Sequence, residues 1–374
     1  MKVLFVLENY FPHVGGVEVV FKNLAEGLVK EGKDVSIITH RLKGTKKFEV
    51  INGVKVFRVS CFHSRYLFTF FSIPKVLRLA READIIHTTT FNGAFPAWLG
   101  AKLLRKPNVI TIHEVWVGRW KELTEMNWFS AKLHSLLEGM IYFLRFDKYV
   151  CVSYSTKKQL LKTGVKGERI SVVYNGVDYE HWNPKKYSGS GVKKRLRLKE
   201  NFVYLFSGRP GVSKGLEYLL KAVPLISKRI GKARLLAIVS KDPAYRKQYK
   251  KMLKLIKKLG VEDKVIIHDP VGYEELPNYV KAADCIVVPS LSEGFGFAAA
   301  EACAMGEAVV VSNTASLPEV VSGRYVLVKP KDVGGIAKGV VDVYKKKFKR
   351  KKLNKFWLRE NIRGYLKVYK NMLK

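Results

Sequence analysis

Short apolar runs rich in valine and isoleucine alternate along the chain with longer segments of helical periodicity. This alternation is typical of β-α-β units built on a parallel sheet. In the first half we expect strands at Val3–Leu7, Val35–Thr39, Val54–Val59, Asp84–His87, Val109–Ile112, Lys148–Val152 and Ile170–Val173. In the second half we expect them at Val203–Ser207, Arg234–Val239, Val265–His268, Cys285–Pro289, Ala308–Ser312 and Tyr325–Val328. The predicted fold class is therefore α/β, with two Rossmann-like series in succession.

The 374 residues exceed what a single core comfortably accommodates, so two domains are expected. Between the two series of strands, residues 184–200 have the composition of a linker, with alternating serine and glycine and many bases. We place an N-terminal domain at 1–183, the linker at 184–200 and a C-terminal domain at 201–354. Residues 355–374 have the apolar spacing of a final helix.

The opening apolar run ends at Glu8, which is too short for a signal peptide and fits a first buried strand. The sequence contains no window of 18 uncharged apolar residues, so a spanning helix is not expected. The four cysteines lie far apart and form no C-x-x-C pair. We interpret them as buried, reduced thiols of a cytosolic protein, and predict no structural metal.

The charge balance is unusual, because 68 Lys and Arg stand against 32 Asp and Glu, a net charge of +36. The densest basic runs are Lys185-Lys186, 193–199 and 345–352. Any one run can be a solvated face, but together they favour an anionic partner, either nucleic acid, an anionic membrane or a phosphorylated substrate. No nucleic-acid-binding motif accompanies the charge, so we favour a membrane surface and expect no specific nucleic acid.

Two aromatic segments, 65–81 and 120–146, are amphipathic or strongly apolar. They are either helices buried against the sheet or an interfacial face whose aromatic side chains enter lipid while bases meet headgroups. The sequence leaves both possibilities open.

In open α/β sheets, ligands bind beyond the carboxyl ends of strands, so residues directly after strands are candidates for chemistry. Gly15-Gly16-Val17-Glu18 follows the first strand and opens a helical segment, where backbone N–H groups attract an anion, although a Gly-Gly turn is also common. His113 follows the strand at 109–112 and is either a substrate contact or a packed core histidine.

The loop at 207–215 combines Arg209 and Lys214 with three glycines after a strand. A planar guanidinium and a point-charge ammonium together suit a pyrophosphate. The loop does not satisfy the Walker A pattern.

The segment 290–313 places Glu293 and Glu301 around a Gly-x-Gly turn and a run of alanines. A dinucleotide fingerprint would need an acid after the next strand, and residues 311–314 supply none. The segment Phe297–Met305 is expected to form a helix that ends at Gly306. Two interpretations of this helix stay open: a small-residue helix packed in a core, or part of a nucleotide-sugar site. Carboxylates that accept hydrogen bonds from vicinal hydroxyls suit a ribose and a sugar ring.

Five motifs in order resemble the retaining GT-B glycosyltransferases of family 4, the glycogen-synthase and phosphatidylinositol-mannosyltransferase type. They are Gly15–Glu18, Val173–Asp178, Gly208–Gly215, Glu293 with Glu301, and Leu317–Val321. The resemblance runs from Met1 to the final helix. It implies a GT-B fold, two Rossmann-like domains facing across a deep cleft, with the C-terminal helix crossing back to the first domain.

The resemblance also implies roles for individual residues. Glu301 would bind the ribose and Glu293 the donor sugar, while Arg209, Lys214 and the Gly16 amide would bind the diphosphate. His113 would hydrogen-bond the donor sugar near the reacting carbon. The nucleotide base would stack in the loop Pro270-Val271-Gly272, and Gly294, Phe295, Gly296 and Glu319 would complete the donor pocket. Acceptor contacts would come from loops such as 62–71 and 117–128.

The implied activity is retaining transfer of a hexose from a UDP- or GDP-linked sugar to an acceptor, either lipid-linked or a glycan. No D-x-D pair stands at a strand end, so cations would replace a metal and no cofactor is expected. We expect a cytoplasmic protein at the inner membrane face. The alternatives are a GT-B nucleotide-sugar epimerase and a basic nucleic-acid- or membrane-binding protein. Three positions depart from the family pattern, Glu114, Ser240 and the pair Ala315-Ser316, where a Gly-Gly pair is usual.

Overall fold

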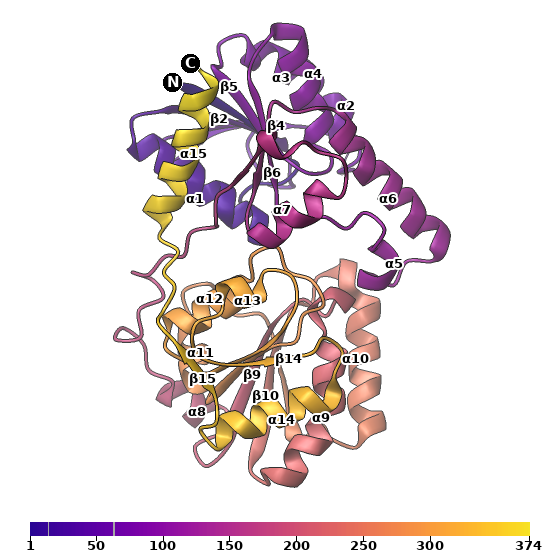
Figure 1. The fold of residues 1–374 in the computed structure, drawn as a ribbon, viewed down its shortest axis with the longest axis vertical. Helices are drawn as coiled ribbons and strands as arrows, with labels where there is room; N and C mark the ends of the chain where they lie inside the picture. The colour runs from indigo at the N-terminus through magenta and orange to yellow at the C-terminus, as the bar shows by residue number, and fades with distance from the viewer. Residues whose placement is uncertain (14, 63) are drawn as a thin grey trace. The chain divides into compact units, whose positions relative to one another are not determined.

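Two β-sheets organise the chain, one in each of two structural units (Figure 1). The computed structural model describes residues 1–13, 15–62 and 64–374, so His63 of the expected acceptor loop lies outside the described residues. Unit 1 comprises residues 1–121, 126–176 and 356–374, and unit 2 comprises 122–125 and 177–355. The two units are described separately below.

The sheet of unit 1 has the strand order β3-β4-β2-β1-β5-β6-β7-β8. The antiparallel pair β3–β4 lies at one edge, and the pairings of the other strands are parallel. The strands are β1 (Lys2–Val6), β2 (Asp34–His40), β3 (Phe48–Ile51), β4 (Val54–Val59), β5 (Ile85–Thr89), β6 (Asn108–Ile112), β7 (Lys148–Cys151) and β8 (Ile170–Val172). The first apolar run of the chain is thus a buried central strand, as predicted.

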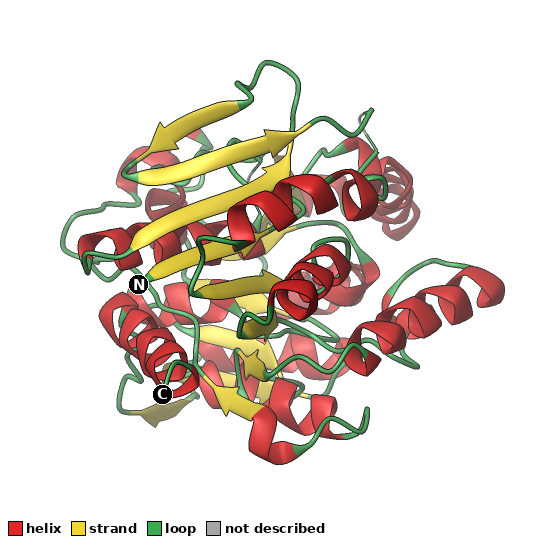
Figure 2. Ribbon diagram, turned by 90° about the horizontal axis from the view of Figure 1, so that it is seen from above, coloured by secondary structure: helices red, strands yellow, loops and turns green. Residues whose placement is uncertain are grey.

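Helices cover both faces of this sheet (Figure 2). Successive residues of β1 point to opposite faces, so Phe5 packs with Phe21 in one core cluster while Leu4 packs with Val76 in another. The helices of unit 1 are α1 (Gly16–Lys30), α2 (Phe68–Phe71), α3 (Ile73–Ala80), α4 (Ala94–Leu104), α6 (Trp128–Phe143), α7 (Tyr154–Leu161) and α15 (Leu358–Met372). The short helix α5 (Trp120–Leu123) begins in unit 1 and ends in unit 2.

The C-terminal helix α15 packs on unit 1 beside α1, which confirms that the end of the chain returns to the first domain (Figure 1). Its Tyr369 hydroxyl lies 2.6 Å from Nδ1 of the buried His87, and its Tyr365 hydroxyl lies 3.0 Å from Oγ1 of Thr111. Burial lowers the pKa of His87 to about 3, so the imidazole is neutral. Asn361 donates to the carbonyl of Tyr174 at 2.6 Å.

The sheet of unit 2 has the order β11-β10-β9-β12-β13-β14-β15. Its strands are β9 (Phe202–Gly208), β10 (Ala233–Val239), β11 (Val265–His268), β12 (Cys285–Val288), β13 (Val309–Ser312), β14 (Gly323–Val328) and β15 (Lys349–Lys351). Its helices are α8 (Ser190–Arg195), α9 (Leu216–Arg229), α10 (Arg246–Leu259), α11 (Leu276–Ala282), α12 (Phe297–Ala304), α13 (Leu317–Val320) and α14 (Val333–Tyr344). A hydrophobic core that includes β9, β10, α9 and α14 supports the sheet.

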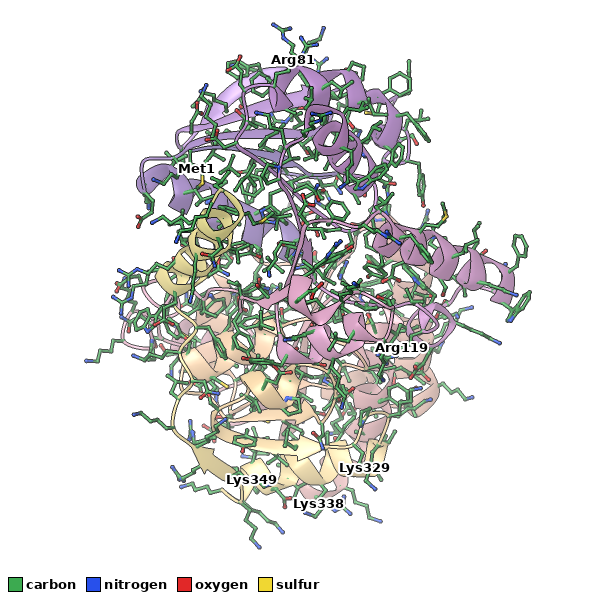
Figure 3. All side chains as sticks on the ribbon, turned by 45° about the horizontal axis from the view of Figure 1, so that its top comes forward. Met1, Arg81, Arg119, Lys329, Lys338 and Lys349 are labelled. Atoms are coloured by element: carbon green, nitrogen blue, oxygen red, sulfur yellow. The ribbon has the colours of Figure 1, made fainter. Side chains whose placement is uncertain are left out.

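Two strands were not predicted. The strand β3 joins β4 through Asn52 and Gly53, whose φ angles of 48° and 82° form a tight hairpin turn. An Asn-Gly pair between short β-rich runs is a hairpin signal that could have revealed this strand. The strand β15 lies inside the basic run 345–352 and pairs antiparallel with β14. Its exposed Lys349, Arg350 and Lys351 make the sheet edge charged, which discourages pairing with another chain (Figure 3).

The segment 184–200, for which the composition predicted a linker, is instead part of unit 2. It contains α8, whose Val192 is buried, and Lys193 forms an ion pair with Asp284 at 3.1 Å. A side chain at Gly189 would lie 2.3 Å from the backbone nitrogen of Ala282, so this glycine permits close contact between the segment and α11.

The four cysteines are buried and free, as predicted. Among the described residues, no helix combines the length and the apolar character required to cross a membrane.

The contact between α15 and unit 1 gives a first prediction. Tyr369→Phe should lower the free energy of unfolding by about 1–2 kcal/mol, because it leaves the buried Nδ1 of His87 without its partner. Urea unfolding followed by circular dichroism measures the change. Tyr344→Phe, at a half-exposed position of α14, is the matched control and should change stability by less than about 0.5 kcal/mol. Equal effects of the two substitutions would contradict the role of this hydrogen bond.

Candidate active site

The strand order of unit 2 brings two loops together. The strands β9 and β12 are neighbours, while β10 continues the sheet on one side and β13 on the other. Such a reversal of strand order opens a crevice at the carboxyl ends of the strands, and ligands bind there in α/β sheets. The loop 209–215 follows β9 and the loop 289–296 follows β12.

The two loops touch through their backbones. Gly215 has a φ angle of 67°, and a Cβ atom there would lie 2.0 Å from the carbonyl oxygen of Pro289. Glycine is therefore required at this position. The backbone N–H of Leu291 donates to the carbonyl of Ser213 at 2.7 Å. These contacts hold the two loops in one arrangement.

A short ion pair connects the same loops. Nζ of Lys214 lies 2.6 Å from Oε1 of Glu293, and the hydroxyl of the buried Ser290 donates to the same oxygen at 2.8 Å. The Lys214 side chain is 25% exposed and that of Glu293 12%, so the pair is partly shielded from solvent. The structure thus brings together the predicted phosphate cation and the predicted sugar-binding carboxylate.

Arg209 begins the loop after β9, but its guanidinium is held by a residue that the sequence did not reveal. Nη1 donates to the hydroxyl of Tyr245 at 3.0 Å, and the guanidinium carbon lies 5.6 Å from the centre of the tyrosine ring. Tyr245 ends a one-turn helix, Pro243–Tyr245, that follows β10. Stacking on an aromatic ring and a hydrogen bond orient an arginine side chain.

The turn Gly294-Phe295-Gly296 lies between the ion pair and α12. Gly296 has a φ angle of 93°, and a Cβ atom there would lie 2.8 Å from Cδ2 of Leu317. The hydroxyl of the buried Ser316 lies 2.9 Å from the carbonyl oxygens of both Glu293 and Phe295. The turn is therefore fixed against the start of α13, where Glu319 occupies the first turn.

Glu301 lies on the second turn of α12. Desolvation raises the pKa of this carboxyl group to about 8, well above its ordinary value of 4.5. In the described part of the chain, no other side chain forms a hydrogen bond or an ion pair with it. Such a carboxyl group can form hydrogen bonds with a ligand without first breaking bonds to other side chains.

The loop Pro270-Val271-Gly272, the predicted base-binding segment, precedes Tyr273. The Tyr273 ring stacks on His181 with 4.1 Å between ring centres, and its hydroxyl accepts from Nε1 of Trp182 at 3.1 Å. Desolvation raises the pKa of Tyr273, and the charge of Glu301 adds to this effect, so the two side chains are near one another. The predicted base-binding loop 270–272 therefore lies near Glu301.

Unit 1 contains a second crevice of the same kind, because β1 and β5 are neighbours where its strand order reverses. Nδ2 of Asn92, after β5, donates to Oε2 of Glu8, after β1, at 2.6 Å. Arg65 forms an ion pair with the same carboxylate at 3.1 Å. Neither Glu8 nor Asn92 was predicted from the sequence as part of a site.

The start of α1 borders this crevice. Oε1 of the buried Glu18 lies 3.1 Å from Nδ1 of His13, and a Cβ atom at Gly15 would lie 2.5 Å from the Glu18 carboxylate. A Cβ atom at Gly16 would meet no atom of the other described segments within 4 Å, so the side-chain position there is unfilled.

His113, at the end of β6, lies next to α1, with its ring centre 6.0 Å from that of Phe21. Desolvation lowers the pKa of His113 to about 4, although the charge of Glu18 opposes the shift. Its Nε2 atom is buried and has no hydrogen-bond partner among the described residues. This histidine is a neutral imidazole with one unpaired ring nitrogen.

The sequence of each unit matches a family model. Residues 14–181 match Glycosyltransferase Family 4, and residues 192–356 match Glycosyl transferases group 1. An uncharacterized glycosyltransferase of Methanocaldococcus jannaschii is 31% identical over 361 residues, covering 91% of this chain and 88% of the relative. The chain belongs to the family 4 glycosyltransferases.

Two further similarities are more distant. The GDP-mannose:cellobiosyl-diphosphopolyprenol alpha-mannosyltransferase of Xanthomonas campestris is 27% identical over 84% of this chain and 79% of its own length. The crystal structure of the Anabaena protein HepE in complex with UDP superposes with a TM-score of 0.73 at 17% identity, covering 99% of this chain and 100% of that one. The two-sheet architecture is a GT-B fold, which confirms the predicted fold class.

This glycosyltransferase departs from its family pattern at Ala315-Ser316, and the structure explains one half of the departure. Ser316 supplies the hydroxyl that holds the carbonyls of Glu293 and Phe295, a contact that glycine cannot make. Ala315 has a φ angle of 48°, a left-handed conformation that favours glycine.

Several contacts of the glycosyltransferase site were not predicted, namely those of Ser290, Ser316, Tyr245 and Tyr273. Ser290 could have been found, since it directly follows the strand end that precedes Glu293. Tyr245 approaches the site from a distant segment that no local pattern marks, whereas Tyr273 and Ser316 adjoin the predicted loop 270–272 and the family motif 317–321.

The turn before α12 gives a second prediction. Gly296→Ala should lower the free energy of unfolding by about 1–3 kcal/mol, because alanine is strained at this φ angle and its Cβ atom would displace Leu317. Gly334→Ala is the matched control, because a Cβ atom there meets only ordinary contacts within a helix. It should change stability by less than about 1 kcal/mol, in the stabilising direction. Thermal unfolding of both variants tests this, and unchanged stability of Gly296→Ala would contradict it.

A third prediction concerns pH. Because the folded-state pKa of Glu301 is raised from 4.5 to about 8, the folded state binds more protons than the unfolded state between these pH values. The stabilising contribution of this group is therefore fully present below about pH 4.5 and is lost as the pH rises to about 8. Glu301→Gln removes the effect, so the variant should gain stability over the wild type on going from about pH 5 to about pH 8.5, by on the order of 2–5 kcal/mol.

Denaturant unfolding at the two pH values measures the difference. The control is Glu262→Gln, at an exposed position of the same unit. Its stability should differ from that of the wild type by the same amount at both pH values. A pH-independent difference between Glu301→Gln and the wild type would show that the carboxyl group titrates normally.

Proposed function

We propose that this glycosyltransferase moves a hexose from a UDP- or GDP-linked sugar to an acceptor, with retention of configuration and without a metal ion. The observation on which the proposal depends is the Lys214–Glu293 pair at the crevice of unit 2, next to the start of α12 and the open carboxyl group of Glu301. Arg209, held by Tyr245, supplies a second cation on the same loop.

The chemistry follows from the charges. Departure of a nucleoside diphosphate develops negative charge on the phosphate and positive charge on the sugar carbon. Fixed cations at the phosphate stabilise this state more than the ground state, because they do not have to reorganise during the reaction. In our proposal Lys214 and Arg209 bind the diphosphate, Glu293 accepts hydrogen bonds from the sugar hydroxyls, and Glu301 bonds the ribose. The loop Pro270–Gly272 receives the base, while Gly294, Phe295, Gly296 and Glu319 line the pocket.

Unit 1 contributes two groups to the proposed reaction. In our proposal the backbone N–H of Gly16 donates to the diphosphate, and Nε2 of His113, which has no partner among the described residues, hydrogen-bonds the sugar. A neutral imidazole suits this role, since a charged one would repel the positive sugar carbon. We assign no carboxylate nucleophile, because Glu293 is engaged by Lys214 and Ser290, and we propose front-face attack with the leaving phosphate as base.

Names of similar proteins support the donor and acceptor classes. The structure of HepE contains UDP, and the Xanthomonas relative is named for GDP-mannose and a diphosphopolyprenol acceptor. We therefore propose a nucleotide-sugar donor and a lipid-linked acceptor at the cytoplasmic membrane face.

The experiment is a donor panel. Purified protein is incubated with UDP- and GDP-sugars, with and without a chelator, and release of UDP or GDP is measured. We expect turnover of at least one donor, unchanged by the chelator. Lys214→Ala should lower kcat/KM about 100-fold, because it removes a charge that stabilises the leaving group. Lys221→Ala, an exposed lysine of α9, should leave activity unchanged.

No turnover of any donor, or full activity of Lys214→Ala, would contradict the proposal. Conversion of the nucleotide sugar without nucleotide release would indicate the epimerase alternative. Loss of activity on adding the chelator would refute metal independence, and NMR of the product would refute retention if the anomeric configuration is inverted.

A further inference from the structure

The helix α6 exposes a stripe of apolar side chains, which is unusual for a surface helix. Its outward face, defined here as Phe129, Leu133, Leu136, Leu137, Met140 and Phe143, is exposed, with exposed fractions from 44% at Leu133 to 84% at Phe143. These positions recur with helical spacing, so they form one stripe along the 16-residue helix. Figure 3 shows side chains of this helix extending away from its ribbon.

The opposite face of α6 buries Ala131 and Tyr142 together with one charged residue, Glu138. The Glu138 carboxylate accepts hydrogen bonds from the backbone N–H of Trp116 at 2.9 Å, from Nε1 of Trp120 at 2.7 Å and from the hydroxyl of Tyr142 at 2.9 Å. Rotating the helix to bury its apolar stripe would expose the Glu138 carboxylate and break its bonds to Trp116 and Trp120, which lie outside the helix. The orientation of the outward face is therefore fixed by specific contacts within unit 1.

The helix α10 shows the usual arrangement and serves as a comparison. It buries Met252 and Ile256, and its Lys and Arg side chains provide the polar face. The chain thus builds an ordinary amphipathic surface helix elsewhere, whereas α6 leaves an apolar face exposed.

A second group of exposed aromatic residues is connected to α6 by contacts within unit 1. Phe70 and Phe71 of α2 are 63% and 46% exposed. Thr69 of α2 donates to the carbonyl of Asn92, and the neighbouring Phe91 contacts the ring of Trp120, which bonds Glu138. The α2 aromatics and α6 therefore belong to one connected part of the unit (Figure 1).

The excess of basic residues in the two segments favours an anionic partner. The segments 61–81 and 126–146 together contain six Lys and Arg and a single acid, the inward Glu138. On α6 itself, Nζ of Lys132 lies 4.9 Å from the ring centre of the exposed Trp128. An exposed aliphatic and aromatic face with an exposed tryptophan and a lysine on the same helix is the composition of a helix that lies in the interface of an anionic membrane.

We infer that the outward face of α6 inserts into the headgroup boundary of an anionic lipid bilayer and holds the enzyme there. This extends the proposed membrane location by naming the surface. Its test contains no donor, so failure here and failure of the donor panel are separate results.

The experiment is flotation of the full chain with vesicles of phosphatidylcholine alone or of phosphatidylcholine and phosphatidylglycerol in equal amounts. We expect binding to the anionic vesicles and little to the neutral ones. Leu136→Gln should lower the partition coefficient about tenfold, because it removes one apolar side chain from the lipid. Leu103→Gln is the matched control, since Leu136 and Leu103 are both 62% exposed, and it should bind like the wild type.

Insertion depth is measured by fluorescence. Anionic vesicles should shift the tryptophan emission of the wild type to shorter wavelength, and Trp128→Phe should lose most of that shift while keeping its circular dichroism spectrum. Equal binding of Leu136→Gln and wild type, with binding abolished by salt, would show that surface cations alone bind lipid and would overturn the inference. Self-association that is lost in Leu136→Gln, with no vesicle binding, would identify a second copy as the occupant and would also overturn it.

Discussion

Contact between the loops that follow β9 and β12 is the constraint on which the candidate site of unit 2 depends. The missing side chain of Gly215 lets the backbone pass the carbonyl of Pro289, and only then can Lys214 reach Glu293. Both loops are short continuations of buried parallel strands, so the position of the ion pair is set by the sheet rather than by flexible side chains. A leaving phosphate that binds there would meet charges already in place.

The sequence was most informative where one physical signal dominates. Strands buried on both faces appear as uninterrupted apolar runs, so those of both sheets were predicted to within one or two residues. The edge strands β3 and β15 lack that signal, because alternate residues of β3 are exposed and β15 consists of three exposed bases. Residues 184–200 were predicted to be a linker for the same reason, because α8 is polar and has no apolar run. Its position is set by packing against α11.

For the site, charged residues directly after strands were predicted, and the residues that orient them were not. Tyr245 holds Arg209 from 36 positions away, and Ser316 holds the carbonyls of the Glu293 turn from 23 and 21 positions away. Such contacts depend on the register of the folded sheet, which one sequence does not display. The face of α6 was left open for a related reason, because periodicity shows that a helix has two faces but not which of them is turned inward.

The return of α15 to unit 1 has a consequence for biosynthesis. Tyr365, Leu366, Val368 and Tyr369 are part of the same core as Val3 and Phe5, so the first strand of the chain and its last helix share one hydrophobic interior. During translation the sheet of unit 1 emerges long before this helix, so one of its flanks stays uncovered until α15 has been synthesised. Unit 2, whose residues 177–355 are synthesised in between, can complete its own core earlier. The order of folding should therefore be the reverse of the order in which the two sheets are made.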